Sequence, residues 1–212
     1  MTIKQLMKDH KLYVSDGNIK VKCTIWCLPA IKTCKKCLKC HKYCFALKSE
    51  IQYPDCRPCR ERNLKASKRS TFIDVMSDIV SRKKSSYFRI HESGDFYSAD
   101  YALAWFEIIE RNPDTTFYAY TKRWGKHKKG EWIFSAKMLA ERPKNLVLIA
   151  SVDDIQTRIP AGPPKGFDKV AIVMEKGNST CPAQKDESTL CIRHCKRCAS
   201  KRCSKVIVFD KH

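Results

Sequence analysis

Cysteine is the residue type in this chain whose number and spacing most clearly predict chemistry. The 212 residues contain 13 cysteines, which form an amino-terminal and a carboxy-terminal group. Thiolates two or three residues apart converge on one metal centre, because the short loop between them curls around it. The amino-terminal group is Cys23, Cys27, Cys34, Cys37, Cys40, Cys44, Cys56 and Cys59, and the carboxy-terminal group is Cys181, Cys191, Cys195, Cys198 and Cys203.

The expected compartment favours metal over disulfides as the use of these thiols. The first residues lack the apolar run of a signal peptide, and no stretch approaches the roughly 18–20 apolar residues of a membrane helix. We therefore expect a cytoplasmic protein, where clustered cysteines are more often metal ligands than bridges. Ten of them are predicted metal ligands: Cys34, Cys37, Cys40, Cys44, Cys56, Cys59, Cys181, Cys191, Cys195 and Cys198.

The spacing of the cysteines does not determine which metal they bind. Cys56-x2-Cys59 is typical of half a zinc site. Cys191-x3-Cys195-x2-Cys198 has the order found in radical S-adenosylmethionine enzymes, where three cysteines leave one iron of a 4Fe–4S cluster open for the cofactor. The segment after the first strand, Cys37-x2-Cys40-x3-Cys44, has a different order. The sequence therefore predicts one or two iron–sulfur clusters of the 4Fe–4S type, with zinc as the alternative metal.

The net charge of +20 indicates a polyanionic partner. A surplus of this size attracts nucleic acid and accelerates its association, and it exceeds what solubility requires. We expect DNA or RNA, which the sequence does not distinguish, and no membrane partner. The predicted phosphate contacts are Arg57, Arg60, Arg62, Arg123, Arg193 and Arg197.

Apolar patterning predicts an α/β fold. The expected strands lie near 19–26, 87–91, 116–120, 146–150, 170–174 and 206–209. Helical patterns separate several of them, including an apolar stripe from Phe72 to Val80, a helix that begins at Ser98, and a helix over 131–142. Three prolines make 152–169 a loop. This alternation predicts a partial (β/α) barrel of about six mostly parallel strands, with a doubly wound open sheet as the second choice.

Polar residues follow three consecutive strands of the predicted sheet. Residues 91–96 follow the second strand, 121–124 the third and 151–154 the fourth. In parallel α/β folds the carboxyl ends of the strands form the working face. We expect Glu92, Asp95, Lys122 and Asp153 to act in catalysis. We expect Ser93, Gly94, Thr121 and Ser151 to bind a cofactor.

Several stretches of the chain resemble the phage "gene product 88" family. They are residues 28–34, 40–48, Arg62-Asn63, 89–98, 120–122 and the closing Cys181-Pro182 with the cysteines that follow. The resemblance implies a phage or prophage protein but no particular activity. It implies that Cys34, Cys40 and Cys44 are shared amino-terminal ligands and that Cys181, Cys191, Cys195 and Cys198 are shared carboxy-terminal ones. The family is also distantly similar to radical S-adenosylmethionine barrels, in which the place of residues 92–95 would bind the cofactor.

These observations predict a single α/β domain over 1–212, with a cysteine-rich metal-binding insert at 23–62 and a cysteine-rich segment at 181–203. The predicted function is an iron–sulfur, nucleic-acid-binding phage protein. One alternative is a radical-SAM-like enzyme that uses S-adenosylmethionine on a nucleotide or nucleic acid. Another is a zinc-stapled or redox-sensing regulator. Whether the chain is an enzyme stays open at this stage, as does its oligomeric state.

Overall fold

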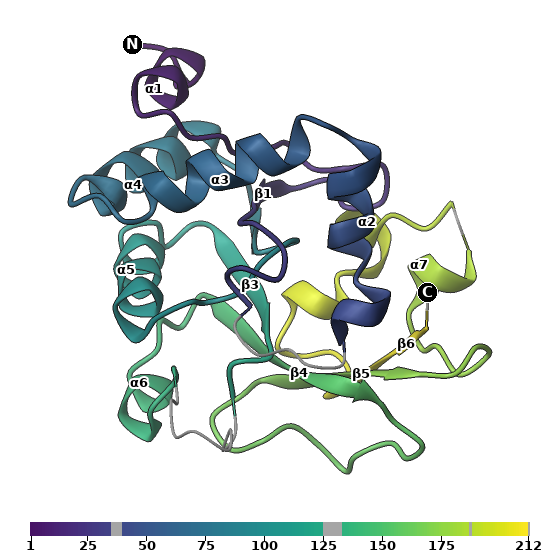
Figure 1. Ribbon diagram of the computed structural model, residues 1–212. Coiled ribbons are helices and arrows are strands. Elements are labelled where there is room, and N and C mark those ends of the chain that lie inside the picture. The colour runs from purple at the N-terminus through teal and green to yellow at the C-terminus, as the bar shows by residue number, and fades with distance from the viewer. Residues whose placement is uncertain (35–39, 125–132, 187, 212) are drawn as a thin grey trace.

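The strands form one parallel sheet in the order in which they occur along the chain. A computed structural model describes residues 1–34, 40–124, 133–186 and 188–211. The sheet has six strands in the order β1-β2-β3-β4-β5-β6, and every neighbouring pair is parallel. They are β1 (Thr24–Trp26), β2 (Tyr87–Ile90), β3 (Thr116–Thr121), β4 (Leu146–Ile155), β5 (Lys169–Met174) and β6 (Val206–Asp210). The sheet does not close, so the predicted partial α/β barrel is confirmed (Figure 1).

Helices of different lengths connect these strands. α1 (Ile3–Asp9) precedes the sheet. The connection from β1 to β2 contains η1 (Cys40–Tyr43), α2 (Phe45–Gln52), α3 (Cys56–Ala66) and α4 (Phe72–Lys83). α5 (Ala99–Glu110) joins β2 to β3, and α6 (Ala136–Ala140) joins β3 to β4. α7 (Pro182–Lys185), η2 (Cys191–Cys195) and η3 (Arg197–Ala199) lie between β5 and β6.

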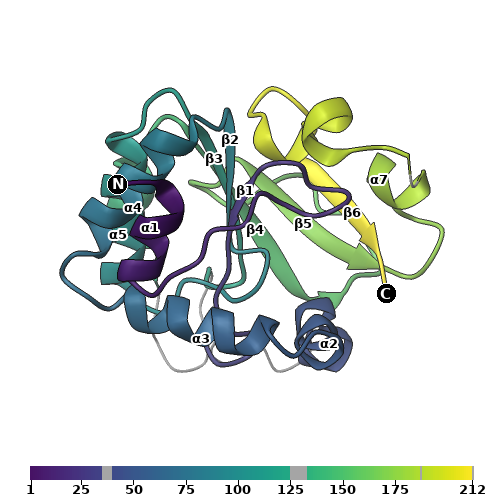
Figure 2. The same cartoon turned by 90° about the horizontal axis from the view of Figure 1, so that it is seen from above.

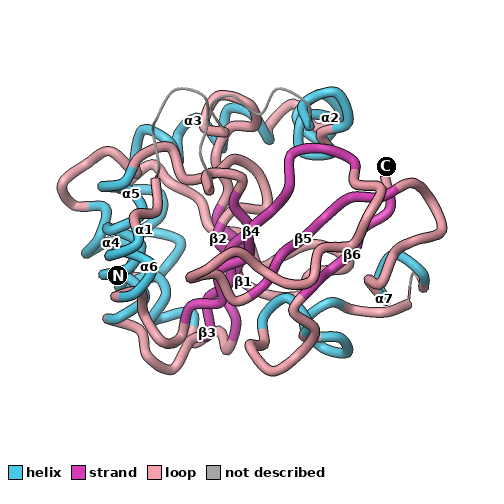
Figure 3. Tube along the Cα trace, turned by 90° about the horizontal axis from the view of Figure 1, so that it is seen from below, coloured by secondary structure: helices cyan, strands magenta, loops and turns pink. Residues whose placement is uncertain are grey.

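The two faces of the sheet have different coverings. Side chains alternate between faces along a strand, so Phe88, Ile90 and Phe117 join the buried cluster formed with α4 and α5. Tyr118 and Ile149 point to the opposite face, where Ile192 and Ala199 of the carboxy-terminal segment pack. Figure 3 shows α4, α5 and α6 on one side of the sheet, and Figure 2 shows α2 and the carboxy-terminal segment away from α4 and α5.

The first strand and the third predicted helix are shorter than the sequence indicated. The strand expected over 19–26 begins only at Thr24, because Asn18 Oδ1 accepts hydrogen bonds from the backbone N–H groups of Lys20 and Val21 and holds a turn there. The helix expected over 131–142 spans Ala136–Ala140 and is capped by Ser135. Residues 131 and 132 lie outside the described part of the chain.

The loop expected over 152–169 is confirmed only after Ile155. β4 continues past residue 150 as far as Ile155, with a register shift against β5 between Ser151 and Ile155. The remaining residues up to 168 contain neither helix nor strand. No described helix has the length and apolar character needed to cross a lipid bilayer.

The helix-covered face contains an aromatic cluster centred on Trp105 of α5. Trp105 is fully buried, and its ring centroid lies 5.6 Å from that of Phe88 and 5.8 Å from that of Phe72. Trp26 of β1 also contacts it, at 6.3 Å. Rings at these separations pack edge to face and contribute through both burial and ring geometry. This cluster fastens α4 and α5 to the first two strands.

Replacing Trp105 by alanine is expected to lower the free energy of unfolding by about 3–5 kcal/mol, because it leaves a cavity among three aromatic rings. Urea denaturation measures the change. Leu103 on the same helix is 48% exposed, so Leu103→Ala serves as the matched control and should shift the value by less than about 0.5 kcal/mol. Equal effects of the two variants would contradict the proposed role of the cluster.

Candidate functional site

A cavity of about 640 Å³ opens on the sheet face opposite α4 and α5. Its floor is formed by side chains of β2, β3 and β5, and its rim by residues after β2 and β3. Both cysteine groups line it, although they lie far apart in the sequence. Among the described residues, seven cysteines line the cavity: Cys34, Cys40, Cys44, Cys181, Cys191, Cys195 and Cys198.

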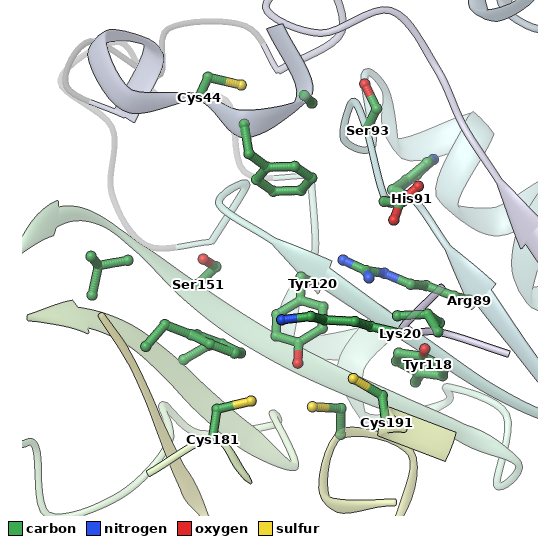
Figure 4. A pocket seen from close by; sticks show the side chains of 18 of the residues that line it. Lys20, Cys44, Arg89, His91, Ser93, Tyr118, Tyr120, Ser151, Cys181 and Cys191 are labelled. Carbon is green, nitrogen blue, oxygen red and sulfur yellow. The ribbon is translucent and has the colours of Figure 1, made fainter. Parts of the chain in front are cut away.

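The two groups occupy different sides of the cavity. Cys44 lies on one side, next to α2, and Cys181 and Cys191 lie on the other (Figure 4). The side chains of Cys181 and Cys191 point toward one another in this view. We call the first side, formed by Cys34, Cys40 and Cys44, the amino-terminal wall. We call the second, formed by Cys181, Cys191, Cys195 and Cys198, the carboxy-terminal wall.

A buried ion pair holds the amino-terminal wall together. Arg60 of α3 pairs with Glu50 of α2 at 3.0 Å, and both side chains are more than 90% buried. Arg60 also donates to the backbone carbonyl of Ala46 at 3.0 Å, while Glu50 accepts from the backbone N–H of Ala30 at 2.9 Å. The pair therefore links α3, α2 and the loop that follows β1. Breaking such a buried pair is costly, because it leaves one charge uncompensated.

Asn63 of α3 links this helix by hydrogen bonds to the chain on either side of β1. Its side-chain amide donates to the carbonyls of Tyr13 and Cys27, at 2.8 and 3.0 Å, and its oxygen accepts from the backbone N–H of Tyr13. The residue is 1% exposed. Sequence reasoning assigned it no role, although Arg62-Asn63 is one of the stretches that carry the family resemblance.

The loops after β1 and β2 pack directly against each other. The backbone N–H of Leu28 donates to the carbonyl of Ser93 at 2.9 Å, and that of Asp95 donates to Thr33 Oγ1 at 3.3 Å. Gly94 lies between them with a φ of +83°, and a Cβ there would stand 2.6 Å from Thr33 Oγ1 and 2.7 Å from Leu28 Cβ. Only glycine fits this close approach without strain.

Seven of the eight predicted catalytic and cofactor-binding residues line the cavity. They are Glu92, Ser93, Gly94, Asp95, Thr121, Lys122 and Ser151. Asp153 belongs to β4, but its side chain lies outside the described part of the structure. The strand-end rule thus brings residues from three connections to one place.

Asp95 is engaged in the framework of the site. Its carboxylate accepts from the backbone N–H groups of Lys122 and Phe96, at 2.8 and 2.7 Å, and the residue is 4% exposed. Burial raises the pKa of Asp95, while these hydrogen bonds act in the opposite direction. The residue therefore joins the end of β2 to the end of β3.

Lys122 and Ser151 join the next two strands at the rim. Lys122 Nζ donates to Ser151 Oγ at 3.1 Å, and Trp124 Nε1 donates to the carbonyl of Ser151 at 2.8 Å. His91 lies deeper, at 3% exposure, with Nε2 3.0 Å from the hydroxyl of Tyr101. Burial and the charge of Arg89 lower the pKa of His91 to about 3. His91 is therefore neutral at physiological pH.

A backbone hydrogen bond joins the carboxy-terminal wall to the segment that precedes β1. The backbone N–H of Cys191 donates to the carbonyl of Lys20 at 2.9 Å. Burial, and then the proximity of Cys181, raise the pKa of Cys191. Burial also raises the pKa of Cys198 to about 11, although a hydrogen bond with Tyr120 opposes the change. Both shifts favour the neutral thiols of Cys191 and Cys198, and a bound metal would convert these two groups to thiolates.

The cysteines do not already surround a single ion. Among the described residues, no three His, Cys, Asp or Glu side chains are grouped closely enough to hold one metal ion. Cys37, one of the predicted ligands, lies outside the described part of the chain. Cys56 and Cys59 lie on the first turn of α3 and do not line the cavity. Any site they form would be separate from it.

The predicted phosphate contacts differ in their exposure. Arg57, Arg62 and Arg193 are exposed, and Arg197 is half-buried with a hydrogen bond to the carbonyl of Thr180. Arg60 is buried in the pair with Glu50 and is therefore unavailable to a phosphate at the surface. Arg123 is 4% exposed. A phosphate at the surface would therefore not reach its guanidinium directly.

Comparison with known proteins gives the family. The model of the gene product 88 family matches residues 4–208. The chain belongs to this family. Segments of 49 residues are 45% identical to the Gene 88 protein of Mycobacterium phage L5 and 41% identical to that of Mycobacterium phage D29. Each match covers 23% of this chain and 20% of the relative, so it spans about a fifth of the phage proteins.

The predicted phage family is thus confirmed, and the chain is a phage-type gene product. No solved structure matches it significantly. None of these matches indicates a relationship to radical S-adenosylmethionine enzymes. In this gene product 88 protein, the function has to be inferred from the cavity itself.

The contact at Gly94 supplies a test of how the amino-terminal wall is placed. Gly94→Ala is expected to lower the free energy of unfolding by about 1–3 kcal/mol, because the new methyl group is strained at positive φ and collides with Leu28 and Thr33. Gly162→Ala is the control, since a Cβ there meets nothing within 4 Å. Its stability, measured in the same urea titration, should stay unchanged or rise slightly. A neutral Gly94→Ala would show that the two loops are not in contact.

Proposed function

We propose that this protein is an iron–sulfur protein that acts on nucleic acid or its nucleotides, with clusters held in the walls of the cavity. One observation carries the proposal. Seven cysteines from opposite ends of the chain line a single cavity at the carboxyl ends of parallel strands. Structural cysteines that serve only as small apolar side chains have no reason to gather around an open space.

The chemistry of the donors fits such a cofactor. Cys181, Cys191, Cys195 and Cys198 supply four thiolates, the number that holds a complete 4Fe–4S cluster. Cys34, Cys40 and Cys44 supply three on the other wall, and a three-cysteine set leaves one iron free for an outside ligand. A cluster would supply electron transfer or an open iron site to a molecule in the cavity, while the surrounding residues bind and orient that molecule.

The charge supports a nucleic-acid partner. The net charge of +20 remains strongly positive even after each cluster site subtracts about two charges. Exposed cations lie on α3, beside the amino-terminal wall, and on η2 of the carboxy-terminal wall; they include Arg57, Arg62 and Arg193. A polyanion lying over the cavity would meet cations on both sides.

A radical-SAM-like enzyme is the second candidate, favoured by one feature of the topology. The amino-terminal wall follows β1, and the Glu92–Asp95 turn follows β2, so the cluster and an acidic cofactor site would be neighbours at the cavity. The engagement of Asp95 by two backbone N–H groups weighs against it as a free cofactor ligand. Glu92 remains at the cavity for that role.

Anaerobically purified protein is expected to contain iron and acid-labile sulfide and to absorb broadly near 400 nm. Cys191→Ser/Cys195→Ser should lose the iron of the carboxy-terminal wall, and Cys34→Ser/Cys44→Ser that of the other, because each removes two ligands. Cys203→Ser is the matched control, since Cys203 is half-buried and does not line the cavity. Metal and sulfide analysis of the four proteins provides the measurement.

Other outcomes of that analysis point to other functions. Zinc without colour or sulfide would refute the iron–sulfur proposal and favour a zinc-stapled regulator. Iron whose EPR signal in the reduced protein changes with S-adenosylmethionine, together with release of 5′-deoxyadenosine, would favour the radical enzyme. A cluster that is lost on oxidation together with partner binding would favour a redox sensor.

Binding to short single-stranded DNA or RNA is expected to weaken steeply as salt rises, because each phosphate contact releases a counterion. Arg57→Gln/Arg62→Gln should weaken binding uniformly across sequences and reduce the salt slope by about one unit per residue. Arg82→Gln/Arg111→Gln removes the same charge from α4 and the end of α5, on the other face, and serves as control. Fluorescence anisotropy measures both slopes. Salt-independent binding would contradict the nucleic-acid proposal.

A further inference from the structure

Arg89 lies on the floor of the cavity with no acidic partner. It is the third residue of β2, between Phe88 and Ile90, which are fully buried on the other face. Alternation along the strand therefore turns Arg89 toward the cavity, as Figure 4 shows. In the described part of the chain no carboxylate forms an ion pair with it, and its buried Nε has no hydrogen-bond partner.

Two other enclosed arginines of the chain each form an ion pair with a carboxylate. Arg60 pairs with Glu50 at 3.0 Å, and Arg142 pairs with Asp168 at 2.6 Å. A guanidinium is costly to remove from water unless an anion and hydrogen-bond acceptors compensate for it. Around Arg89 lie the ring of Tyr120, 5.5 Å away, and the polar groups of Tyr118, Glu92 and Cys198, none of which forms an ion pair with it in the described part of the chain. An anion that enters the cavity would supply what is missing.

Two lysines add positive charge around the same space. Lys20 and Lys122 both line the cavity. Lys20 Nζ donates to the carbonyl of Ala183 at 3.0 Å, and Lys122 Nζ donates to Ser151 Oγ at 3.1 Å. The acceptor of Lys20 is a neutral carbonyl, which orients the ammonium group without cancelling its charge. Figure 4 shows Lys20 reaching into the space in front of Tyr120, below Arg89.

Aromatic side chains provide the other half of a nucleotide site. Tyr118, Tyr120 and Phe209 line the floor, and Phe45 at the start of α2 lines the cavity while remaining 47% exposed. Aromatic rings stack on bases without regard to sequence, and an arginine fork matches the oxygens of a phosphate. A volume of about 640 Å³ lies within the usual range for sites that enclose small molecules.

We infer that the cavity binds a single nucleotide, with its phosphate on Arg89 between Lys20 and Lys122 and its base against the aromatic side chains. This inference rests on the proposed function and narrows it, because it names a mononucleotide as the molecule that reaches the cysteine walls. An extended polyanion would stay on the exposed arginines outside.

Arg89 could instead serve the clusters, since it lies close enough to Cys198 for their charges to interact. That role alone does not account for the two lysines on the cavity or for the exposed ring of Phe45. It also makes a different prediction, because a residue that only balances cluster charge would alter the reduction potential without altering ligand binding.

The test titrates the full-length protein, as purified with its metal, with AMP, GMP, CMP and UMP, and separately with inorganic phosphate and adenosine. Calorimetry should show that nucleotides bind more tightly than either phosphate or adenosine alone. Arg89→Met, which keeps the side-chain volume, should weaken nucleotide binding at least 30-fold, because losing one partner of an enclosed charged contact costs about 2 kcal/mol or more. Arg89→Lys should recover part of the affinity, since it keeps the charge but not the fork.

Two further variants serve as controls for charge and for folding. Arg82→Gln on α4 removes a positive charge far from the floor of the cavity and should bind like the wild type. Thermal melting will reveal whether Arg89→Met folds. Lys20→Gln should also weaken nucleotide binding, and it tests the site independently of Arg89→Met. Nucleotides that bind no more tightly than phosphate would overturn the inference. So would wild-type affinity in Arg89→Met with a shifted reduction potential.

Failure of the two proposals can be told apart. Protein that lacks iron but binds AMP in an Arg89-dependent manner would refute the iron–sulfur function and leave the nucleotide site standing. Protein with clusters that binds no nucleotide would refute the site alone.

Discussion

The contact between the loops after β1 and β2 determines where the amino-terminal wall stands. Gly94 lets Leu28 and Thr33 approach closer than any side chain would allow, and backbone hydrogen bonds join the two loops on either side of it. From this point the chain runs through Cys34 to α2, which the Arg60–Glu50 pair holds against α3. Glycine adopts this positive φ without strain, which is why the two loops can approach each other here.

The second constraint is electrostatic. A chain with a net charge of +20 has few carboxylates to use, yet two of its enclosed arginines receive buried acidic partners. Asp168 also accepts from the backbone N–H of Leu148, so it serves the sheet as well as Arg142. Against this background an enclosed arginine without an acid marks a place where charge compensation comes from outside the protein. Burial also raises the pKa of Cys198 to about 11, and a bound metal would convert this neutral thiol to a thiolate.

Much of the fold was predictable because one face of the sheet is continuously apolar. Runs such as Leu146–Ala150 identify buried strands, and Ser98 identifies a helix start, since each signal is local. The position of the candidate site followed from topology alone, because parallel strands bring their carboxyl ends to one edge. The convergence of the amino-terminal and carboxy-terminal walls on one cavity was not predictable. It depends on how the sheet curves and on which face each connection covers.

The residues that sequence reasoning misjudged are those whose role depends on a distant partner. Arg60 belongs to a run of basic residues and so indicated a phosphate contact, but it is buried in an ion pair with Glu50 of α2. Asn63 has no local signal, since the carbonyls it satisfies belong to residues 27 and 13. Arg89 occupies a normal polar position in an alternating strand, which usually faces solvent. Only the position of the carboxy-terminal segment over that face makes it an interior charge.

The two ends of the chain therefore depend on each other at the cavity. The turn that Asn18 holds shortens β1, and it also presents the carbonyl of Lys20 to the backbone N–H of Cys191. Lys20 in turn reaches Ala183 beside the carboxy-terminal wall. The residues that begin the fold thus place its last cysteines, while the α2–α3 unit places the first ones. A molecule bound between the walls would contact both ends of the chain at once, so its binding would stabilise the sheet by linkage as well as fill the cavity.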